Sequence, residues 1–130
     1  MAIYPTREQI RTLLEHPSDA PIVMVNLLRF KPRADAPDAG MSGAEAYALY
    51  GERMRGIVER HGGRILWTGR VDSVAIEDGG QRYDAVALVE YPSRKVFVEI
   101  ATSAEVAEID VHRAAGLESQ WLLATTAGRF

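Results

Sequence analysis

The fold is decided by a ten-residue stretch, Ile22-Val23-Met24-Val25-Asn26-Leu27-Leu28-Arg29-Phe30-Lys31. It is rich in β-formers and apolar at both odd and even positions, which is typical of a strand that is covered on both faces. Asn26 places an amide in the middle of this run. Burying an amide without a partner costs about 1–3 kcal/mol, so Asn26 is expected to bind either protein backbone or a ligand.

Before this strand, the sequence predicts a short helix. Thr6 can cap it, it runs through His16, and Pro17 stops it. One buried face is expected from the spacing of Ile10, Leu13 and Leu14.

After the strand, residues 32–43 are dominated by Pro, Ala, Asp and Gly and have no periodicity. This composition predicts an exposed loop of unusual length, of the kind that often serves as a lid. Ser42 and Glu45 then have the spacing of a capping box, which begins a helix that Gly62-Gly63 ends. Its predicted buried stripe consists of Tyr47, Tyr50, Gly51, Met54, Ile57, Val58 and His61.

The second half of the chain predicts a hairpin, two helical segments and a last strand. The hairpin pairs residues 64–77, bent at Gly69, with residues 83–91 through a turn at residues 78–80. Helix follows Pro92-Ser93 and breaks near Thr102-Ser103, where Thr102 and Glu105 are spaced as another capping box. Helix then resumes to about Ala115, Gly116 caps it, and the last strand covers residues 120–126.

This order predicts a single α+β domain over residues 1–130. It is the ferredoxin-like β-α-β-β-α-β arrangement with an extra N-terminal helix and a four-stranded antiparallel sheet. Both main helices of such a fold lie on one face of the sheet, yet the strands are apolar on both faces. Exposing several such side chains costs about 1.5–3 kcal/mol each, so we expect a second copy of the chain to cover the open face. The alternative is that the helix at residues 6–16 shields part of it.

Composition excludes several classes of function. The net charge is only -3 and no one-sign block occurs among the 130 residues, which argues against nucleic acid as a partner. The chain has no cysteine, so disulfides, thiolate nucleophiles and cysteine-ligated metals are excluded. No signal-like N-terminus or apolar run long enough to span a membrane is evident, and a cytoplasmic location is expected.

Several segments together resemble a family of small bacterial proteins, the domain of unknown function thirteen-thirty, in the dimeric α/β-barrel superfamily. The segments are Val25 to Lys31, Tyr47-Ala48-Leu49-Tyr50, Arg60 to Arg64, Val89 to Arg94, and His112 to Leu117 followed by a Thr-rich strand. The resemblance covers roughly residues 22–126, and the long loop at 32–42 and the N-terminal helix depart from it. It implies a ferredoxin-like protomer whose sheet packs on that of its twin, usually with a cleft in each half. Related proteins in the superfamily include cofactor-independent monooxygenases, lactone isomerases and haem-handling proteins, but a shared fold transfers no chemistry by itself.

The candidate site residues each have an ordinary structural explanation as well. Tyr47 and Tyr50 lie on the buried stripe, where aromatic residues are usually core, yet a hydroxyl could donate to a substrate. Arg29 faces away from Asn26 in an ideal strand, and a surface salt bridge would explain it. Trp67, like Trp121, could line a pocket or simply pack.

The three histidines divide in the same way. His16 and His61 stand at predicted helix C-termini, where the helix dipole explains a cationic side chain. His112 could act as a base or as an axial haem ligand, or could be an ordinary packing residue. No histidine pair has zinc-site spacing, and no phosphate loop or hydrolase elbow occurs, so no metal or cofactor is expected.

These observations favour a homodimer that binds a small hydrophobic or aromatic molecule in a pocket lined by Asn26, Tyr47, Tyr50 and Trp67, with Arg29 as a further ligand-binding candidate. If it is an enzyme, cofactor-independent monooxygenase- or isomerase-like chemistry fits best, with His112 or Asn26 as the catalytic contact. One rival is a haem-binding protein that uses His112. The other is a structural or regulatory dimer in which the Trp67 and Trp121 rings fill the space of the pocket.

Overall fold

The computed structural model describes residues 2–130. Its helices and strands follow one another in the order that the sequence predicts. They are α1 (Arg7–Glu15), β1 (Ile22–Phe30), α2 (Gly43–Arg60), β2 (Arg64–Arg70), β3 (Ala85–Tyr91), α3 (Arg94–Ala101), α4 (Ala104–Gly116) and β4 (Leu117–Thr125).

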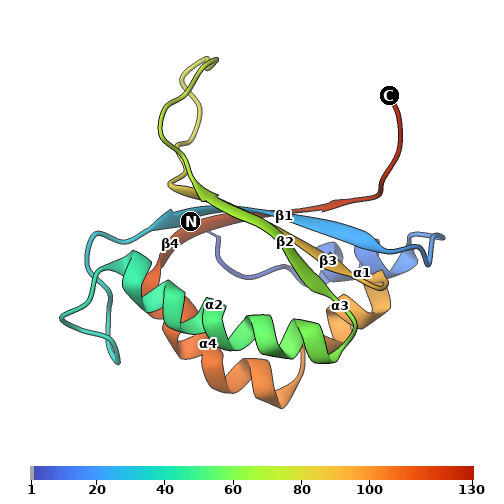
Figure 1. The fold of residues 1–130 in the computed structure, drawn as a ribbon, viewed down its shortest axis with the longest axis horizontal. Helices are drawn as coiled ribbons and strands as arrows, with labels where there is room; N and C mark the ends of the chain where they lie inside the picture. The colour runs from blue at the N-terminus through green and yellow to red at the C-terminus, as the bar shows by residue number, and fades with distance from the viewer. Residues whose placement is uncertain (1) are drawn as a thin grey trace.

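The four strands form one antiparallel sheet in the order β2-β3-β1-β4. Helices α2 and α4 lie together under one face of this sheet (Figure 1). No helix in residues 2–130 covers the other face, above which the 71–84 loop and the C-terminal residues rise (Figure 1). The predicted ferredoxin-like α+β fold with an extra N-terminal helix is confirmed.

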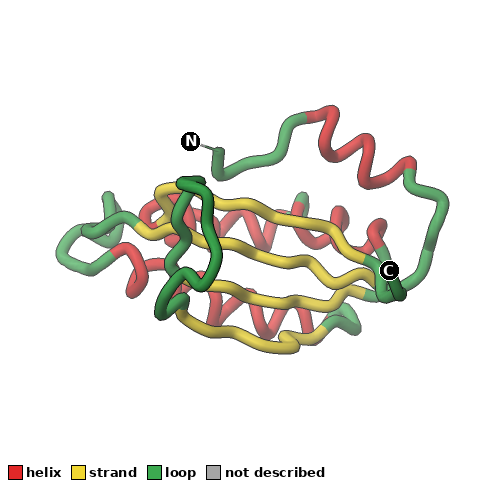
Figure 2. The backbone as a smooth tube through the Cα atoms, turned by 90° about the horizontal axis from the view of Figure 1, so that it is seen from above, coloured by secondary structure: helices red, strands yellow, loops and turns green. Residues whose placement is uncertain are grey.

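The N-terminal helix does not shield the open face. Figure 2 looks onto that face and shows α1 beside the sheet, beyond its edge. α1 contacts α3, and Leu13 packs against the main core, whereas Leu14 is 48% exposed. The prediction that Leu14 is buried is therefore wrong, and so is the idea that α1 covers the second face.

The main core lies between the sheet and the helices. Ile22, Met24 and Leu28 of β1 point into it, because alternate residues of a strand share a face. The core residues from the other elements are Ile57, Val58, Val89, Tyr91, Phe97, Ile100, Val106 and Ile109. His61, which the stripe of α2 predicted to be buried, is exposed and instead forms the C-cap of this helix.

The helix boundaries follow their capping residues. Capping boxes are present at Thr6 with Gln9 and at Ser42 with Glu45, the second of which the sequence predicts. The box predicted at Thr102 is wrong, because Ser103 is the N-cap of α4 and accepts from the backbone N–H of Val106. α4 continues through Gly116, and β4 begins directly after it.

The hairpin is shorter than predicted. β2 ends at Arg70 rather than at residue 77, β3 begins at Ala85, and residues 71–84 form an exposed loop between them, with only Tyr83 partly buried. At the base of this loop the Val71 N–H donates to the Asp84 carbonyl at 2.9 Å, and the Asp84 N–H donates to the Leu28 carbonyl of β1 at 2.7 Å. The pairing between β2 and β3 ends just before them, at Arg70 and Ala85. The irregularity expected at Gly69 lies earlier, between residues 65 and 67.

The segment 31–42 is not the freely exposed loop that its composition predicts. Ala34 and Asp38 are buried at 8% and 7% exposure. The Asp35 N–H donates to the Ala115 carbonyl at 3.0 Å, and the Asp38 carboxylate lies 2.7 Å from Nδ1 of His112. The loop is therefore docked against the C-terminal end of α4.

Two glycines fix how α2 and α4 meet. A Cβ on Gly43 would lie 2.1 Å from the Lys31 carbonyl oxygen, and one on Gly116 would lie 2.3 Å from the Gly43 carbonyl oxygen. Both obstructing atoms are backbone, so neither can rotate away. The start of α2 and the end of α4 can approach this closely only because both positions lack a side chain.

We predict that Gly116→Ala lowers the free energy of unfolding by about 1–3 kcal/mol, because the new methyl group overpacks a backbone contact. Chemical denaturation followed by circular dichroism measures the loss. Gly56→Ala is the control, since a Cβ there meets nothing within 4 Å. It should stabilise the exposed helix position by about 0.5–1 kcal/mol. If the two variants were equally stable, the close approach of α2 and α4 would not depend on glycine at position 116.

We also predict that Asp38→Ala releases the 31–42 loop, because removal of the carboxylate breaks its contact with His112. Hydrogen exchange at the Asp35 amide should accelerate about tenfold, which corresponds to about 1.4 kcal/mol of local stability. Asp35→Ala is the matched control, because its ion pair with Lys31 has a carboxylate that is 67% exposed and should contribute little. Unchanged exchange in Asp38→Ala would show that the backbone hydrogen bonds hold the loop alone.

Candidate functional site

A small cavity of about 90 Å³ lies between α2 and the sheet. Its walls come from α2 and from β1, β2 and β3. The lining residues are Asn26, Tyr47, Tyr50, Gly51, Met54, Val58, Ile65, Ala87, Val89 and Tyr91. The structure thus brings together three of the residues that the sequence singled out, Asn26, Tyr47 and Tyr50.

Three tyrosines give the cavity its polar character. Burial raises the pKa of Tyr47 and of Tyr91, and in each the neighbouring Tyr50 raises it further. Burial also raises the pKa of Tyr50, which Arg113 opposes. The phenols therefore stay protonated at neutral pH. Within residues 2–130, no protein group forms a hydrogen bond with any of these three hydroxyls, whereas the Tyr4 hydroxyl donates to Asp110 at 2.5 Å.

Tyr91 was missed by the sequence reasoning. It ends β3 and is only 4% exposed, and its ring packs edge-on against Phe97 at 5.0 Å between centroids. The sequence does indicate that Tyr91 shares a strand face with Val89, because the two residues are two positions apart. Only the pairing of β3 with β1, however, shows that this face is the one that Asn26 occupies.

The amide of Asn26 is fully engaged. Its Nδ2 donates to the carbonyl oxygens of Met24 at 3.3 Å and Ala87 at 3.2 Å, and its Oδ1 accepts from Nε2 of Gln120 at 2.7 Å. The internal hydrogen bond that was one of the two expectations for Asn26 is therefore present. Asn26 forms part of the cavity wall and is held in place by its neighbours.

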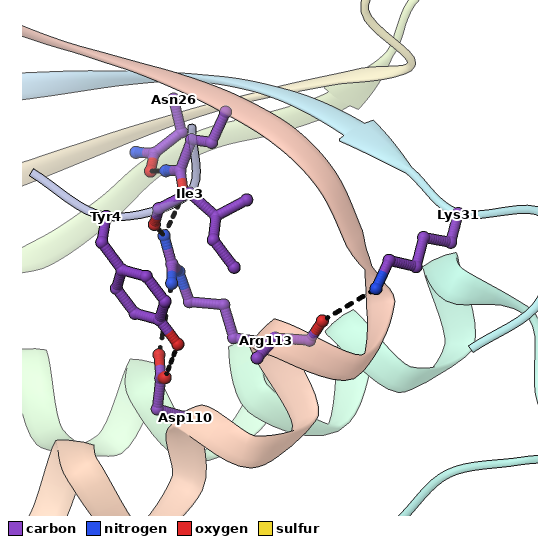
Figure 3. A network of polar contacts seen from close by, with 8 residues as sticks. Ile3, Tyr4, Asn26, Lys31, Asp110 and Arg113 are labelled. Atoms are coloured by element: carbon purple, nitrogen blue, oxygen red, sulfur yellow. Dashed lines mark hydrogen bonds and ion pairs between the residues drawn. The ribbon is translucent and has the colours of Figure 1, made fainter. Parts of the chain in front are cut away.

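A polar network continues from Asn26 toward the N-terminus (Figure 3). Gln120 accepts from Arg113 at 2.7 Å, and Arg113 pairs with Asp110 at 3.2 Å and also donates to the Ile3 carbonyl. The guanidinium also lies 5.1 Å from the centre of the Tyr4 ring. The network connects β1, β4, α4 and the N-terminal segment behind the cavity. Arg113 and Gln120 were not predicted as site residues, since nothing local in the sequence distinguishes them from surface polar residues.

Trp67 does not line this cavity, contrary to the expectation from the sequence. It pairs with Leu88 on the open face of the sheet and is 55% exposed. Trp121 lies on the same face, is also 55% exposed and packs edge-on against Tyr83. Neither ring fills the space beneath α2.

Arg29 is likewise outside the cavity. It is exposed and alternates with Asn26 and Leu28 along β1, so it projects from the open face, as the strand geometry predicted. No ion pair of Arg29 is present within residues 2–130, so the expected surface salt bridge is not seen there.

His112 lies at a separate place on α4. Its Nδ1 is 2.7 Å from the Asp38 carboxylate, and its side chain is 23% exposed. A carboxylate on Nδ1 fixes the orientation of an imidazole and leaves Nε2 free. His112 lines neither this cavity nor the second hollow described below. Asp38, its partner, was missed because it stands within a segment that composition marks only as loop.

A second hollow of about 320 Å³ lies on the open face, between the 71–84 loop and strands β1 and β3. In it Arg82 pairs with Glu77 at 3.5 Å, and Gln81 donates to Ser119 at 2.8 Å, whereas the Tyr83 hydroxyl is buried without a hydrogen-bond partner among residues 2–130. Its apolar wall includes Leu27. Because an exposed loop forms one side of it, this hollow is a less well-defined site than the cavity beneath α2.

The part of the chain that the structure describes shows no group of three or more histidine or acidic residues placed to hold a metal ion. None of its helices combines the length and the apolar character that a membrane crossing requires.

Comparison with known proteins places the chain among structural relatives. The crystal structure of RPA0582, a protein of unknown function from Rhodopseudomonas palustris, superposes with a TM-score of 0.87 at 35% sequence identity and covers 98% of this chain and 97% of its own. The structure of the methylated RPA0582 protein gives the same TM-score and identity, over 98% and 96% of the two chains. No curated protein sequence shows significant similarity to the chain.

The family model described as Domain of unknown function (DUF1330) matches residues 39–127. The matched segment contains α2 and its tyrosines, the hairpin, α3, α4 and β4. It covers more than half of the chain, and the match agrees with the resemblance noted in the sequence. The chain therefore belongs to the DUF1330 family.

Proposed function

We propose that this protein is a homodimer in which the two open sheet faces pack together, and that each protomer binds a small organic molecule in the cavity beneath α2. The observation that carries the binding proposal is that three protonated tyrosines line one mostly apolar cavity and that none of their hydroxyls has a hydrogen-bond partner among residues 2–130. These hydroxyl oxygens are not among the side-chain atoms that are sealed from solvent, so a bound molecule can reach them and accept from them.

The open sheet face supports the dimer. Its apolar side chains come from all four strands: Val23, Val25, Leu27, Trp67, Val86, Leu88, Trp121 and Leu123. Trp67 and Trp121 are each 55% exposed, and Leu123 is 43% exposed. Burying such side chains contributes about 25 cal/mol per Å², and a second copy offers a surface of the same apolar character.

The tryptophans agree with one part of the alternative, a dimer without a ligand. That alternative fills the interior of the dimer with the Trp67 and Trp121 rings, and both rings stand on the open sheet face that would line this interior. Neither ring fills the cavity beneath α2, which lies on the opposite face of the sheet. No observation favours haem over a smaller ligand, since His112 points to Asp38 and neither hollow reaches it.

The proposal concerns binding rather than catalysis. The cavity contains phenols whose pKa values are raised by burial and an amide that is already paired. Neither is a general base at neutral pH, and His112 is held elsewhere. Monooxygenase- or isomerase-like chemistry would have to draw its proton acceptor from the substrate or from outside the cavity wall.

The dimer is tested by placing a charge on the open face. We predict that the wild-type chain sediments as a dimer at micromolar concentration and that Leu123→Glu sediments as a monomer, because a carboxylate would be buried without a partner. Val111→Glu is the matched control, since Val111 is 47% exposed on α4, away from the sheet. A wild-type monomer, or a Leu123→Glu dimer as tight as that of the control, would contradict the proposed packing.

The cavity is tested by filling it. Gly51 lines the cavity, and a Cβ there meets nothing within 4 Å, so Gly51→Leu should place its side chain in the empty space. We predict that acetone, cyclobutanone or methylenecyclobutane binds to the wild type in NMR titrations and that Gly51→Leu weakens this binding at least tenfold.

Gly56→Leu is the control for this experiment. It adds the same side chain to the same helix, at an exposed position outside the cavity, and should leave binding unchanged. If none of the three probes binds to the wild type, or if Gly51→Leu binds them as well as the control does, the cavity is not the site.

A further inference from the structure

We propose that the molecule bound beneath α2 is a small uncharged carbonyl compound, held through its carbonyl oxygen by two of the three hydroxyls of Tyr47, Tyr50 and Tyr91. The inference rests on the proposed function, since it names the class of ligand for the same cavity. It follows from which hydrogen-bonding groups remain unused there, from the charge around them and from the size of the space.

The unused groups are donors. A protonated phenol has one O–H to give, and these three have no acceptor among residues 2–130. The backbone carbonyls nearest to Asn26 are taken, because its Nδ2 donates to those of Met24 and Ala87 in addition to the bonds of the sheet. A ligand that supplies an acceptor oxygen satisfies the phenols, whereas a ligand that supplies only another donor does not.

The amide of Asn26 contributes no further donor. Both of its N–H groups are engaged, and its oxygen already accepts from Gln120. The polar specificity of the cavity is therefore carried by the tyrosines. Two of them lie on one turn of α2, with ring centres 5.4 Å apart, and the third belongs to β3, so the tyrosines line two walls of the cavity.

The surroundings favour an uncharged ligand. The burial that disfavours ionisation of the tyrosines would equally disfavour a carboxylate in the same place. Arg113 is the nearest cation in the network, but it pairs with Asp110 at 3.2 Å. Its charge is thus balanced within the protein, and a neutral carbonyl oxygen accepts from the phenols through its two lone pairs without requiring a counter-ion.

The size of the cavity limits the rest of the molecule. An apolar cavity of roughly 150 Å³ holds a benzene ring, and this one measures about 90 Å³. Its remaining wall is aliphatic, from Met54, Val58, Ile65 and Val89. The fit is to a short ketone or aldehyde with a compact apolar body.

The test compares cyclobutanone with methylenecyclobutane, which has nearly the same shape but carries CH₂ in place of the carbonyl oxygen. We expect the wild-type protein to bind cyclobutanone at least tenfold more tightly in NMR titrations. The infrared carbonyl stretch of bound cyclobutanone should move to lower frequency, because hydrogen bonds weaken the C=O bond. Cyclobutanecarboxylate, which carries a charged carboxylate on the same ring, should bind more weakly than cyclobutanone.

Single Tyr47→Phe, Tyr50→Phe and Tyr91→Phe variants assign the effect to the hydroxyls. Because a carbonyl oxygen has two lone pairs, two of the three variants should weaken cyclobutanone binding about three- to tenfold, in line with about 0.5–1.5 kcal/mol for one hydrogen bond, and should reduce the infrared shift. Their affinity for methylenecyclobutane should not fall, which shows that the cavity is still formed. Tyr83→Phe, outside the cavity, is the control and should change neither ligand.

The outcomes separate the two proposals. If neither cyclobutanone nor methylenecyclobutane binds and acetone also fails, the proposed function itself is wrong. If cyclobutanone and methylenecyclobutane bind with equal affinity, or if the three variants retain the wild-type affinity and infrared shift for cyclobutanone, the cavity remains a binding site but the carbonyl class is wrong. Tighter binding of cyclobutanecarboxylate also overturns it.

Discussion

The structure depends on the apolar packing of β1, which lies inside the sheet and has apolar side chains on both of its faces. Its inward residues, such as Met24 and Leu28, meet the helices and form the core. Its outward residues, Val23, Val25 and Leu27, lie on the face that the helices leave open. In a ferredoxin-like protomer, the single layer of helices covers only the inward side chains of β1. Its outward side chains stay uncovered, together with tryptophan and leucine side chains of the neighbouring strands.

Asn26 is the exception in the inward row, and the site is built around it. Its amide is held by a neighbouring strand and by Gln120, and Gln120 is held by Arg113. This chain of contacts reaches the N-terminal segment through Ile3 and Tyr4 (Figure 3). A polar residue that would otherwise weaken the core thus ties four separate parts of the chain together, and the space left beside it is where the three tyrosines meet.

The sequence predicted the order of the elements, the fold class and the two apolar faces, because these follow from periodicity and capping. It also predicted that Asn26, Tyr47 and Tyr50 line one cavity, since strand alternation and helix spacing are local properties. It failed where the outcome depends on distant partners. The length of β2 is set by where β3 starts, and Trp67 faces away from the cavity because an irregularity precedes it in the strand pairing.

The partners of the site residues were beyond the sequence for the same reason. Asp38 meets His112 across 74 positions, and Gln120 meets Asn26 across 94. No local pattern encodes such pairs, because both members are individually ordinary. Composition marked residues 32–43 as loop correctly, yet it could not show that hydrogen bonds to α4 would order it.

The contact between Gly43 and Gly116 has a consequence for how α2 can move relative to the sheet. Backbone is pressed against backbone at the first turn of α2, and the docked 31–42 loop lies against the same end of α4. The N-terminal end of α2 therefore has no room to shift. Further along α2, contacts with the core are made by side chains such as Met54 and Val58, which can rotate. Any displacement of α2 is therefore easiest at its C-terminal half, and the helix is anchored at one end only.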